Sequence, residues 1–237
     1  MRMARLGYSL FLLMLGSVVG LAVLNWVKGH PQDIPWTPLS LADPVGRFTN
    51  LKIARLRNDF PACRRLLDQA SEDYRVLPPL RGRGACSYSD RVRLESSPDL
   101  SYVPRAEVSC PMAIGLFLWE RQVVQPAALR YFGRPVKRIE TFGSYACRPV
   151  RGIGERRWSE HARANAIDIA GFRLAGGRRI GIATDWTGGQ REAAFLREVR
   201  TGACSMFSTA LSPDYNRLHR DHLHLDQAMR GGWSFCR

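Results

Sequence analysis

The chain has 237 residues, of which 45% are hydrophobic and 24% charged. This mixture is typical of globular proteins and excludes whole-chain disorder and fibrous structure. The net charge is +14, and all but three of the 35 basic residues are arginine. Such a surface favours anionic partners: phosphate groups, acidic polymers or anionic lipid. Nucleic acid is a poor candidate, because no compact basic run with interleaved aromatic residues is present.

The N-terminal segment from Leu6 to Val27 carries no charged residue. As a helix it would be roughly 33 Å long, enough to cross the hydrocarbon core of a bilayer. Arg2 and Arg5 precede it and only Lys28 follows, which places the N-terminus in the cytoplasm and the rest outside. We therefore expect residues 1–28 to be a single-pass signal-anchor in the inner (cytoplasmic) membrane, with the C-terminal domain in the periplasm. A cleaved signal peptide is the alternative, although no Ala-x-Ala-like site is visible.

Six cysteines follow this segment, at positions 63, 86, 110, 147, 204 and 236. An even number in an exported domain predicts disulfides, and no Cys-x-x-Cys spacing suggests a zinc ribbon or a thioredoxin-like site. Sequential pairing (63–86, 110–147 and 204–236) is a guess among the possible connectivities.

The remaining elements follow in chain order. Residues 29–60 contain four prolines and little periodicity, which predicts a Pro-rich tether. The folded domain is expected to span 61–237. Apolar spacing predicts helices over 61–70, 111–122, 126–132 and 190–201, and alternation predicts strands over 136–142, 166–174, 179–184 and 223–226, with shorter strands within 81–109. This pattern predicts an α+β fold, a small antiparallel sheet flanked by helices.

Four of the five histidines fall in two clusters: Ser159-Glu-His161-Ala-Arg-Ala-Asn-Ala-Ile-Asp168 and His219-Arg-Asp221-His222-Leu-His224-Leu-Asp226. His-x-His on a strand places both imidazoles on one face. Asp168 lies within an apolar strand, where burying an unpaired carboxylate costs several kcal/mol of free energy. It therefore needs a metal ion or a cationic partner. Two histidines and one carboxylate leave a zinc position open for water. Surface histidines, with Asp168 paired to an arginine, are the alternative.

The first cluster resembles the S-x-H-x-x-G-x-A-x-D motif of the LAS metallopeptidases, which include lysostaphin-type enzymes, D-Ala-D-Ala peptidases and the hedgehog domain. Ala164 stands in place of the usual glycine. The second cluster is similar to the penicillin-insensitive murein endopeptidases. A wider pattern, which adds Gly143-Ser-Tyr-Ala-Cys-Arg148 and Phe195-Leu-Arg, resembles the bacterial extensin-like C-terminal domain family over residues 61–237. The resemblance implies a LAS/hedgehog-like fold.

The resemblance further implies that His161, Asp168 and His224 bind Zn²⁺ and that His222 is a general base or transition-state stabiliser. Imidazole suits this role because it titrates near neutral pH. Asp221 is the alternative base: it occupies the position of the catalytic glutamate of the D-Ala-D-Ala peptidases, but it is one methylene shorter.

Four further positions carry weaker expectations. Arg148 is placed like a substrate-binding arginine of the D-Ala-D-Ala peptidases, or forms a structural salt bridge. His219 orients substrate or lies on a loop. Ser159 hydrogen-bonds a ligand or caps a turn, and Asp226 fixes an imidazole or ends a strand.

The expected function is that of a membrane-anchored zinc peptidase or amidase of the cell envelope, a DD- or LD-type endopeptidase or carboxypeptidase. Its expected partner is peptidoglycan or another anionic envelope polymer. The alternative is a non-catalytic, zinc-containing wall-binding or interaction module, as in hedgehog. The presence of both Asp221 and His222 favours catalysis.

Overall fold

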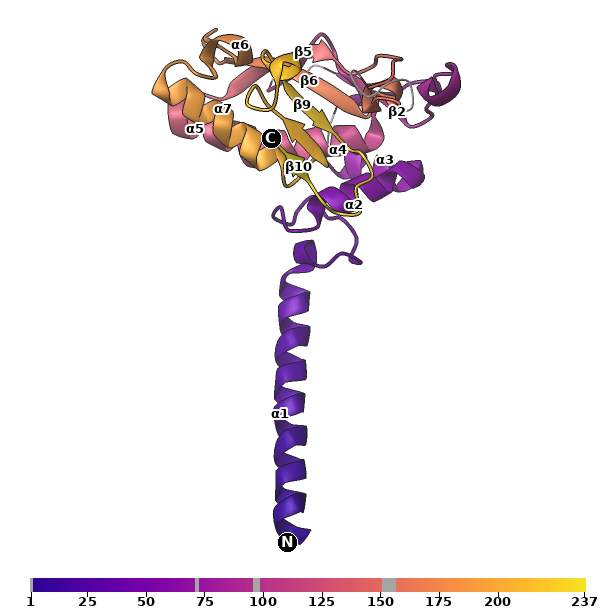
Figure 1. The fold of residues 1–237 in the computed structure, drawn as a ribbon, viewed down its shortest axis with the longest axis vertical. Coiled ribbons are helices and arrows are strands. Elements are labelled where there is room, and N and C mark those ends of the chain that lie inside the picture. Colours follow the sequence, from indigo (N-terminus) through magenta and orange to yellow (C-terminus); the bar gives the residue numbers. More distant parts are fainter. Residues whose placement is uncertain (1, 71–72, 96–98, 151–156) are drawn as a thin grey trace.

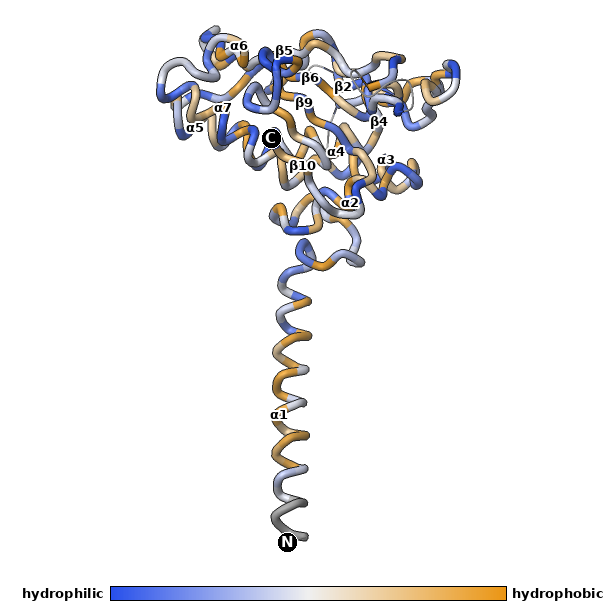
Figure 2. Tube along the Cα trace, in the orientation of Figure 1, coloured by the Kyte–Doolittle hydropathy of each residue, from blue (hydrophilic) through white to orange (hydrophobic). Residues whose placement is uncertain are grey.

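The N-terminal apolar segment forms one long helix, α1 (Arg2–Gly29), which extends away from the rest of the chain in the computed structural model (Figure 1). The structure describes residues 2–70, 73–95, 99–150 and 157–237. Residues Gly7–Gly29 have a mean hydropathy of 2.2, and none of the residues in this apolar window is buried inside the structure. Figure 2 shows this apolar stretch along the middle of α1. Its length and composition suit either a membrane span or a signal sequence.

The segment between α1 and Pro61 differs from the expected tether, because its second half folds onto the domain. Helix α2 (Thr49–Arg55) buries six residues, and Ile53 is fully inaccessible in the main core. Apolar side chains on α2 cover α4, and burying this surface favours packing over an extended linker. The buried Lys52 amino group donates to the Pro31 carbonyl and to Thr37 Oγ1, and so fixes the chain that follows α1.

The remaining helices are α3 (Phe60–Ala70), α4 (Cys110–Trp119), α5 (Gln125–Phe132), α6 (Ile182–Asp185) and α7 (Gln190–Ala203). Helix α4 is buried along its whole length, as an all-apolar helix requires, and Trp119 Nε1 donates to the carbonyl of Val199 in α7 at 2.8 Å. The sequence predicts a break between residues 122 and 126, but a π-helical segment, Glu120–Val124, joins α4 to α5 instead. The expected strand 179–184 is shorter than predicted, because α6 begins at Ile182.

The strands among the described residues form two sheets. They are β1 (Tyr74–Val76), β2 (Arg91–Leu94), β3 (Ser101–Val103), β4 (Glu107–Ser109), β5 (Val136–Gly143), β6 (Ala166–Leu174), β7 (Arg179–Gly181), β8 (Thr209–Leu211), β9 (Leu223–Asp226) and β10 (Phe235–Cys236). The larger sheet has the order β10-β8-β9-β6-β5-β3, with β7 also paired to β6, and the smaller one has the order β1-β2-β4. Helices α4, α5 and α7 lie on the side of the larger sheet that faces α1 (Figure 1).

The α+β class with antiparallel pairing is confirmed for the centre of the larger sheet, where β6 pairs with β5, β7 and β9. The two edges differ from the expectation, because β10–β8 and β3–β5 are parallel pairs. Both edge strands are short, so local periodicity says little about their direction.

The disulfides join Cys63 to Cys110, Cys86 to Cys147 and Cys204 to Cys236. The sequential guess is therefore wrong for the first two pairs and confirmed for the third. Packing of α3 against α4 brings Cys63 to Cys110, and this pairing excludes the predicted bonds 63–86 and 110–147.

Removing the first disulfide with Cys63→Ala and Cys110→Ala should lower the free energy of unfolding. The bond closes a loop with a sequence separation of 47 residues, and loops of this size contribute on the order of 3–4 kcal/mol. Urea unfolding measures the difference from the wild type. The difference should disappear in excess reductant, and its persistence there would show that packing rather than the cross-link is responsible.

Candidate metal centre

Neighbouring strands place an aspartate directly opposite a histidine. Asp168 of β6 is paired in register with His224 of β9. Side chains alternate along a strand, and Ile167 and Ile169 on either side of Asp168 belong to the core. Leu223 and Leu225 flank His224 in the same way. Asp168 and His224 therefore project together from the sheet face that the helices do not cover.

The third member, His161, lies on a 3₁₀ turn, Glu160–Arg163, immediately before β6. Ser159 caps this turn by accepting a hydrogen bond from the His161 backbone N–H at 3.3 Å. The turn ends at Ala164, whose φ of 48° is left-handed and whose N–H donates to the His161 carbonyl. Glycine adopts this conformation without steric cost, so Ala164 occupies a position that favours glycine.

Polar contacts fix the His161 turn to the domain. Glu160 Oε2 accepts hydrogen bonds from Asn165 Nδ2 at 2.6 Å and from the Arg57 guanidinium at 3.1 Å. Ser109, the N-cap of α4, donates in turn to Asn165 Oδ1 at 2.8 Å. His161 itself is only 4% exposed. The turn is therefore held in place by the buried helix beneath it.

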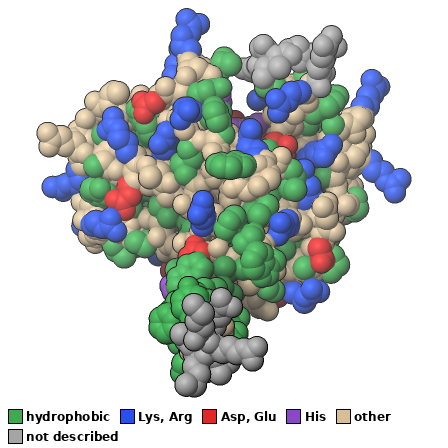
Figure 3. All heavy atoms as spheres, turned by 60° about the horizontal axis from the view of Figure 1, so that its bottom comes forward, with side chains coloured by type: hydrophobic (Ala, Val, Ile, Leu, Met, Phe, Trp, Pro, Cys, Tyr) green, Lys and Arg blue, Asp and Glu red, His purple; other side chains and the backbone are tan. Residues whose placement is uncertain are grey.

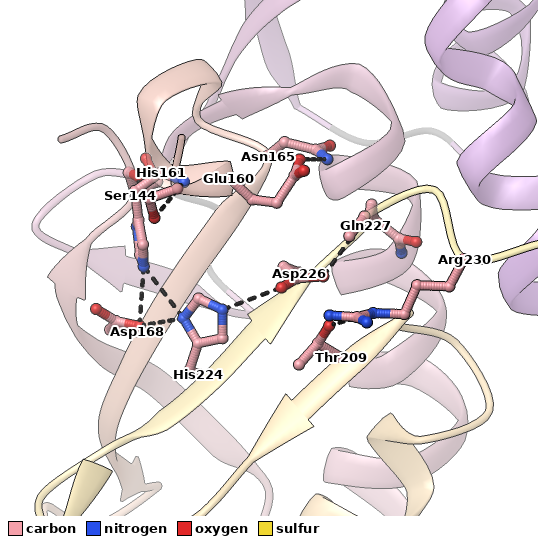
Figure 4. A network of polar contacts seen from close by, with 12 residues as sticks. Ser144, Glu160, His161, Asn165, Asp168, Thr209, His224, Asp226, Gln227 and Arg230 are labelled. Carbon is pink, nitrogen blue, oxygen red and sulfur yellow. Dashed lines mark hydrogen bonds and ion pairs between the residues drawn. The ribbon is translucent and has the colours of Figure 1, made fainter. Parts of the chain in front are cut away.

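Three inner atoms meet where these elements converge (Figure 4). His161 Nε2 lies 3.2 Å from Asp168 Oδ1. His224 Nδ1 lies 2.9 Å from the same oxygen and 3.1 Å from His161 Nε2. Two ligands about 2.0–2.1 Å from a tetrahedral ion are about 3.3 Å apart, so the spacing suits one shared metal ion.

The outer partners determine which ring nitrogens carry hydrogen. His161 Nδ1 lies 2.7 Å from the Ser144 carbonyl, which can only accept, so this nitrogen is the donor. His224 Nε2 lies 3.2 Å from the Asp226 carboxylate and is the donor there. In neutral rings the two inner nitrogens are then acceptors, and they face the carboxylate of Asp168. Three acceptors this close require a cation between them, either a proton or a metal ion.

In the absence of metal, a proton occupies this position. Burial alone raises the pKa of Asp168, but hydrogen bonds from His161 and His224 outweigh it and hold the pKa well below its usual range. Burial alone lowers the pKa of His224, but Asp168 and Asp226 outweigh burial and raise the pKa to about 9. The metal-free cluster is an ion pair at neutral pH.

Two of the remaining candidates lie beside the cluster. His222 Nε2 is 3.6 Å from Asp168 Oδ1, and His222 Nδ1 is 2.8 Å from the Asp221 carboxylate. Asp221 thus lies behind the imidazole. The His219 ring centroid is 5.2 Å from that of His222. Burial, together with the charges of His224 and His222, lowers the pKa of His219 to about 4, so its ring is neutral at pH 7.

Arg148 lies beside the His161 turn, where its carbonyl accepts a hydrogen bond from the Ser159 backbone N–H at 3.2 Å, but its guanidinium has no hydrogen bond to the described residues of the cluster. Its guanidinium donates to the neighbouring Pro149 carbonyl at 3.5 Å, and residues 151–156 lie outside the described part of the chain. Asp226 contacts the imidazole of His224 and Ser159 caps the turn, as one of the two alternatives for each predicts. The contacts of the Ser144 carbonyl and of Asn165 were not predicted from the sequence. The carbonyl has no side-chain signature, because any residue could supply it.

The described residues thus form an α+β domain with a His-Asp-His cluster on one sheet face. The family model for the extensin-like protein C-terminus matches residues 61–237, and the chain belongs to this family. Comparison with curated proteins and with solved structures gives no match.

The ion pair predicts how stability depends on pH in the chelator-treated protein. Because the folded pKa of His224 is raised to about 9, its stabilisation is fully present below the unfolded value near 6.5 and is lost as the pH rises through 9. The free energy of unfolding should fall by on the order of 3 kcal/mol over this interval. Asp226→Asn removes one carboxylate that raises the pKa of His224, so the loss should be smaller and should be complete at a lower pH. A flat profile from pH 6.5 to 9 in urea unfolding would contradict the ion pair.

Proposed function

We propose that this protein is a zinc-dependent hydrolase of the cell envelope, anchored in the inner membrane by α1, that cleaves peptide or amide bonds of peptidoglycan. One observation carries the proposal: His161, Asp168 and His224 present three ligand atoms to one point, and a fourth side chain, His222, lies beside them. The residues suit a metal because their outer hydrogen bonds leave the inner atoms as acceptors.

Two imidazole nitrogens and one carboxylate oxygen are the ligands of many catalytic zinc sites. Zinc bound there would polarise a scissile carbonyl and lower the pKa of water. The chain supplies the rest. Asp221 accepts the hydrogen of His222 Nδ1, which leaves Nε2, on the Asp168 side, free to accept a proton from the attacking water. His222 is accordingly the base in this proposal, and Asp221 orients it.

The substrate class follows from charge, compartment and resemblance. Peptidoglycan is anionic overall, and the chain carries a net charge of +14. Three disulfides suit an oxidising compartment outside the cytoplasm. The motif resemblance to the LAS peptidases points to bonds in stem peptides or cross-bridges. His219 and Arg148 are proposed to orient the substrate.

The purified protein should carry about one equivalent of zinc. His161→Ala, Asp168→Ala and His224→Ala should each abolish binding, because each removes one ligand atom. His222→Ala is the matched control and should retain the metal. Elemental analysis by mass spectrometry, on variants whose fold is checked by circular dichroism, measures this. Full zinc occupancy in all three ligand variants would refute the assigned site. A different metal at full occupancy in the wild type would refute the choice of zinc but not the site.

Hydrolysis of a cross-linked muropeptide should depend on His222. His222→Ala should retain zinc and lower kcat by about 10²–10⁴-fold, the usual contribution of a general base. Asp221→Asn should cost less, because the amide oxygen still accepts from Nδ1. His30 is the one histidine of the sequence that lies in neither cluster. His30→Ala is therefore the matched control and should leave turnover unchanged.

Rates are compared at equal zinc content, with and without chelator. A His222→Ala variant as fast as wild type would contradict the assigned base. A loss with Asp221→Asn equal to that with His222→Ala would favour Asp221 as the base. A zinc-loaded wild type that is inactive on every envelope peptide would favour the wall-binding module.

A further inference from the structure

Two tryptophans are the most exposed large apolar side chains among the described residues outside α1. Trp233 is 81% exposed and Trp36 is 76% exposed. In contrast, Trp119 and Trp186 are buried, at 0% and 4%. Single exposed apolar residues are ordinary, but two exposed indoles on one small region indicate an interaction surface.

Both tryptophans are held by α2. Asn50 Nδ2 donates to the Gly232 carbonyl at 3.5 Å and to Ser234 Oγ at 2.8 Å, one residue on each side of Trp233. The Leu51 side chain lies next to Gly232, because a Cβ added at this glycine would be 3.4 Å from Leu51 Cδ2. The segment around Trp233 is therefore fixed on α2 although it lies near the other end of the chain.

The segment around Trp36 is held by the same helix. Arg55 donates to the Pro35 carbonyl at 2.5 Å, and Lys52 Nζ donates to Thr37 Oγ1 at 2.8 Å. These two contacts again flank the tryptophan on both sides. Helix α2 thus binds the chain on both sides of each tryptophan.

This surface lies next to the point where α1 leaves the domain. The apolar stretch Gly7–Gly29 has 23 residues, or about 35 Å as a helix, against about 30 Å for a bilayer core. A span of this length ends close to the membrane surface, and Trp36 follows a few residues later. In Figure 1, α2 and the C-terminal loop between β9 and β10 both lie at the α1 end of the domain.

The charges of the same region suit an anionic bilayer. Lys28, Arg47 and Arg55 are exposed there, whereas the acidic residues Asp33 and Asp43 are half-buried. Asp33 Oδ1 is also occupied by the backbone N–H of Arg47 at 2.7 Å. Figure 3, which brings this face forward, shows Lys and Arg side chains scattered over it, with fewer Asp and Glu among them.

We propose that this surface, defined by Trp36, Trp233, Lys28, Arg47 and Arg55, docks on the bilayer that holds α1. The indoles lie in the interfacial layer, which favours amphipathic aromatic rings, and the basic groups contact anionic headgroups. The inference rests on the proposed membrane anchor but not on zinc or hydrolysis. In this arrangement the domain contacts the membrane surface directly and is not held away from it by a flexible linker.

The orientation has a functional meaning. The strands that carry Asp168 and His224, β6 and β9, lie on the side of α2 away from α1 (Figure 1). Docking through α2 therefore turns the cluster away from the membrane and toward the envelope polymer.

The test uses the full chain with Trp26→Phe, which removes the tryptophan of α1. The protein is placed in phosphatidylcholine–phosphatidylglycerol vesicles whose acyl chains are brominated near the headgroups, and its tryptophan emission is compared with that in unbrominated vesicles. We expect quenching. Adding Trp36→Phe and Trp233→Phe should abolish the quenching. Adding Trp158→Phe instead is the matched control, because Trp158 is 45% exposed but lies beside the His161 turn, and quenching should persist.

Flotation of the vesicles separates the two ideas. Protein that floats but is not quenched, or whose quenching survives loss of both tryptophans, overturns the docking and leaves the anchor standing. Protein that does not float overturns the anchor and the docking together. Neither result depends on activity.

Discussion

The candidate site depends on one carboxylate in an apolar sheet. Asp168 is placed between two core isoleucines, and its side chain is only 17% exposed. Its charge is tolerated because two imidazoles lie within hydrogen-bonding distance, at 3.2 and 2.9 Å. Each imidazole is oriented from behind, by the Ser144 carbonyl and by Asp226. Loss of any of these partners would leave a buried group unsatisfied, so the cluster behaves as one unit.

The support for this unit extends well into the fold. The turn that carries His161 is tied through Glu160 and Asn165 to the N-cap of α4, the most buried helix of the described chain. The Cys86–Cys147 disulfide fixes the chain three residues after Ser144. The geometry of the cluster is therefore set by the core. His222, the proposed base, and Asp221, proposed to orient it, lie at the edge of the cluster, where the Asp221 side chain is 43% exposed.

Much of this arrangement could be predicted from the sequence, in those elements where a local pattern of apolar and polar residues is compatible with a single structure. The His-x-His alternation and the apolar neighbours of Asp168 predict which side chains share a face, and the register of β6 with β9 agrees. The α3 helix and the strands β5 and β6 follow from periodicity in the same way. Long-range pairing had no such signal: the partners of Cys63 and Cys86 depend on how α3 packs on α4. The packing of α2 was missed because the prolines that precede it suggest a linker, whereas the few apolar residues of the helix itself pack on the core.

The pairing of Asp168 with His224 also bears on how the sheet assembles. Because neighbouring residues on a strand face opposite sides, sliding β9 by one position would replace His224 with Leu223 or Leu225. An imidazole would then enter the hydrophobic core while a leucine met the carboxylate. A one-residue shift of β9 would therefore cost free energy both in the polar cluster and in the hydrophobic core. The residues proposed for chemistry thus also help to fix the register of the strands that carry them.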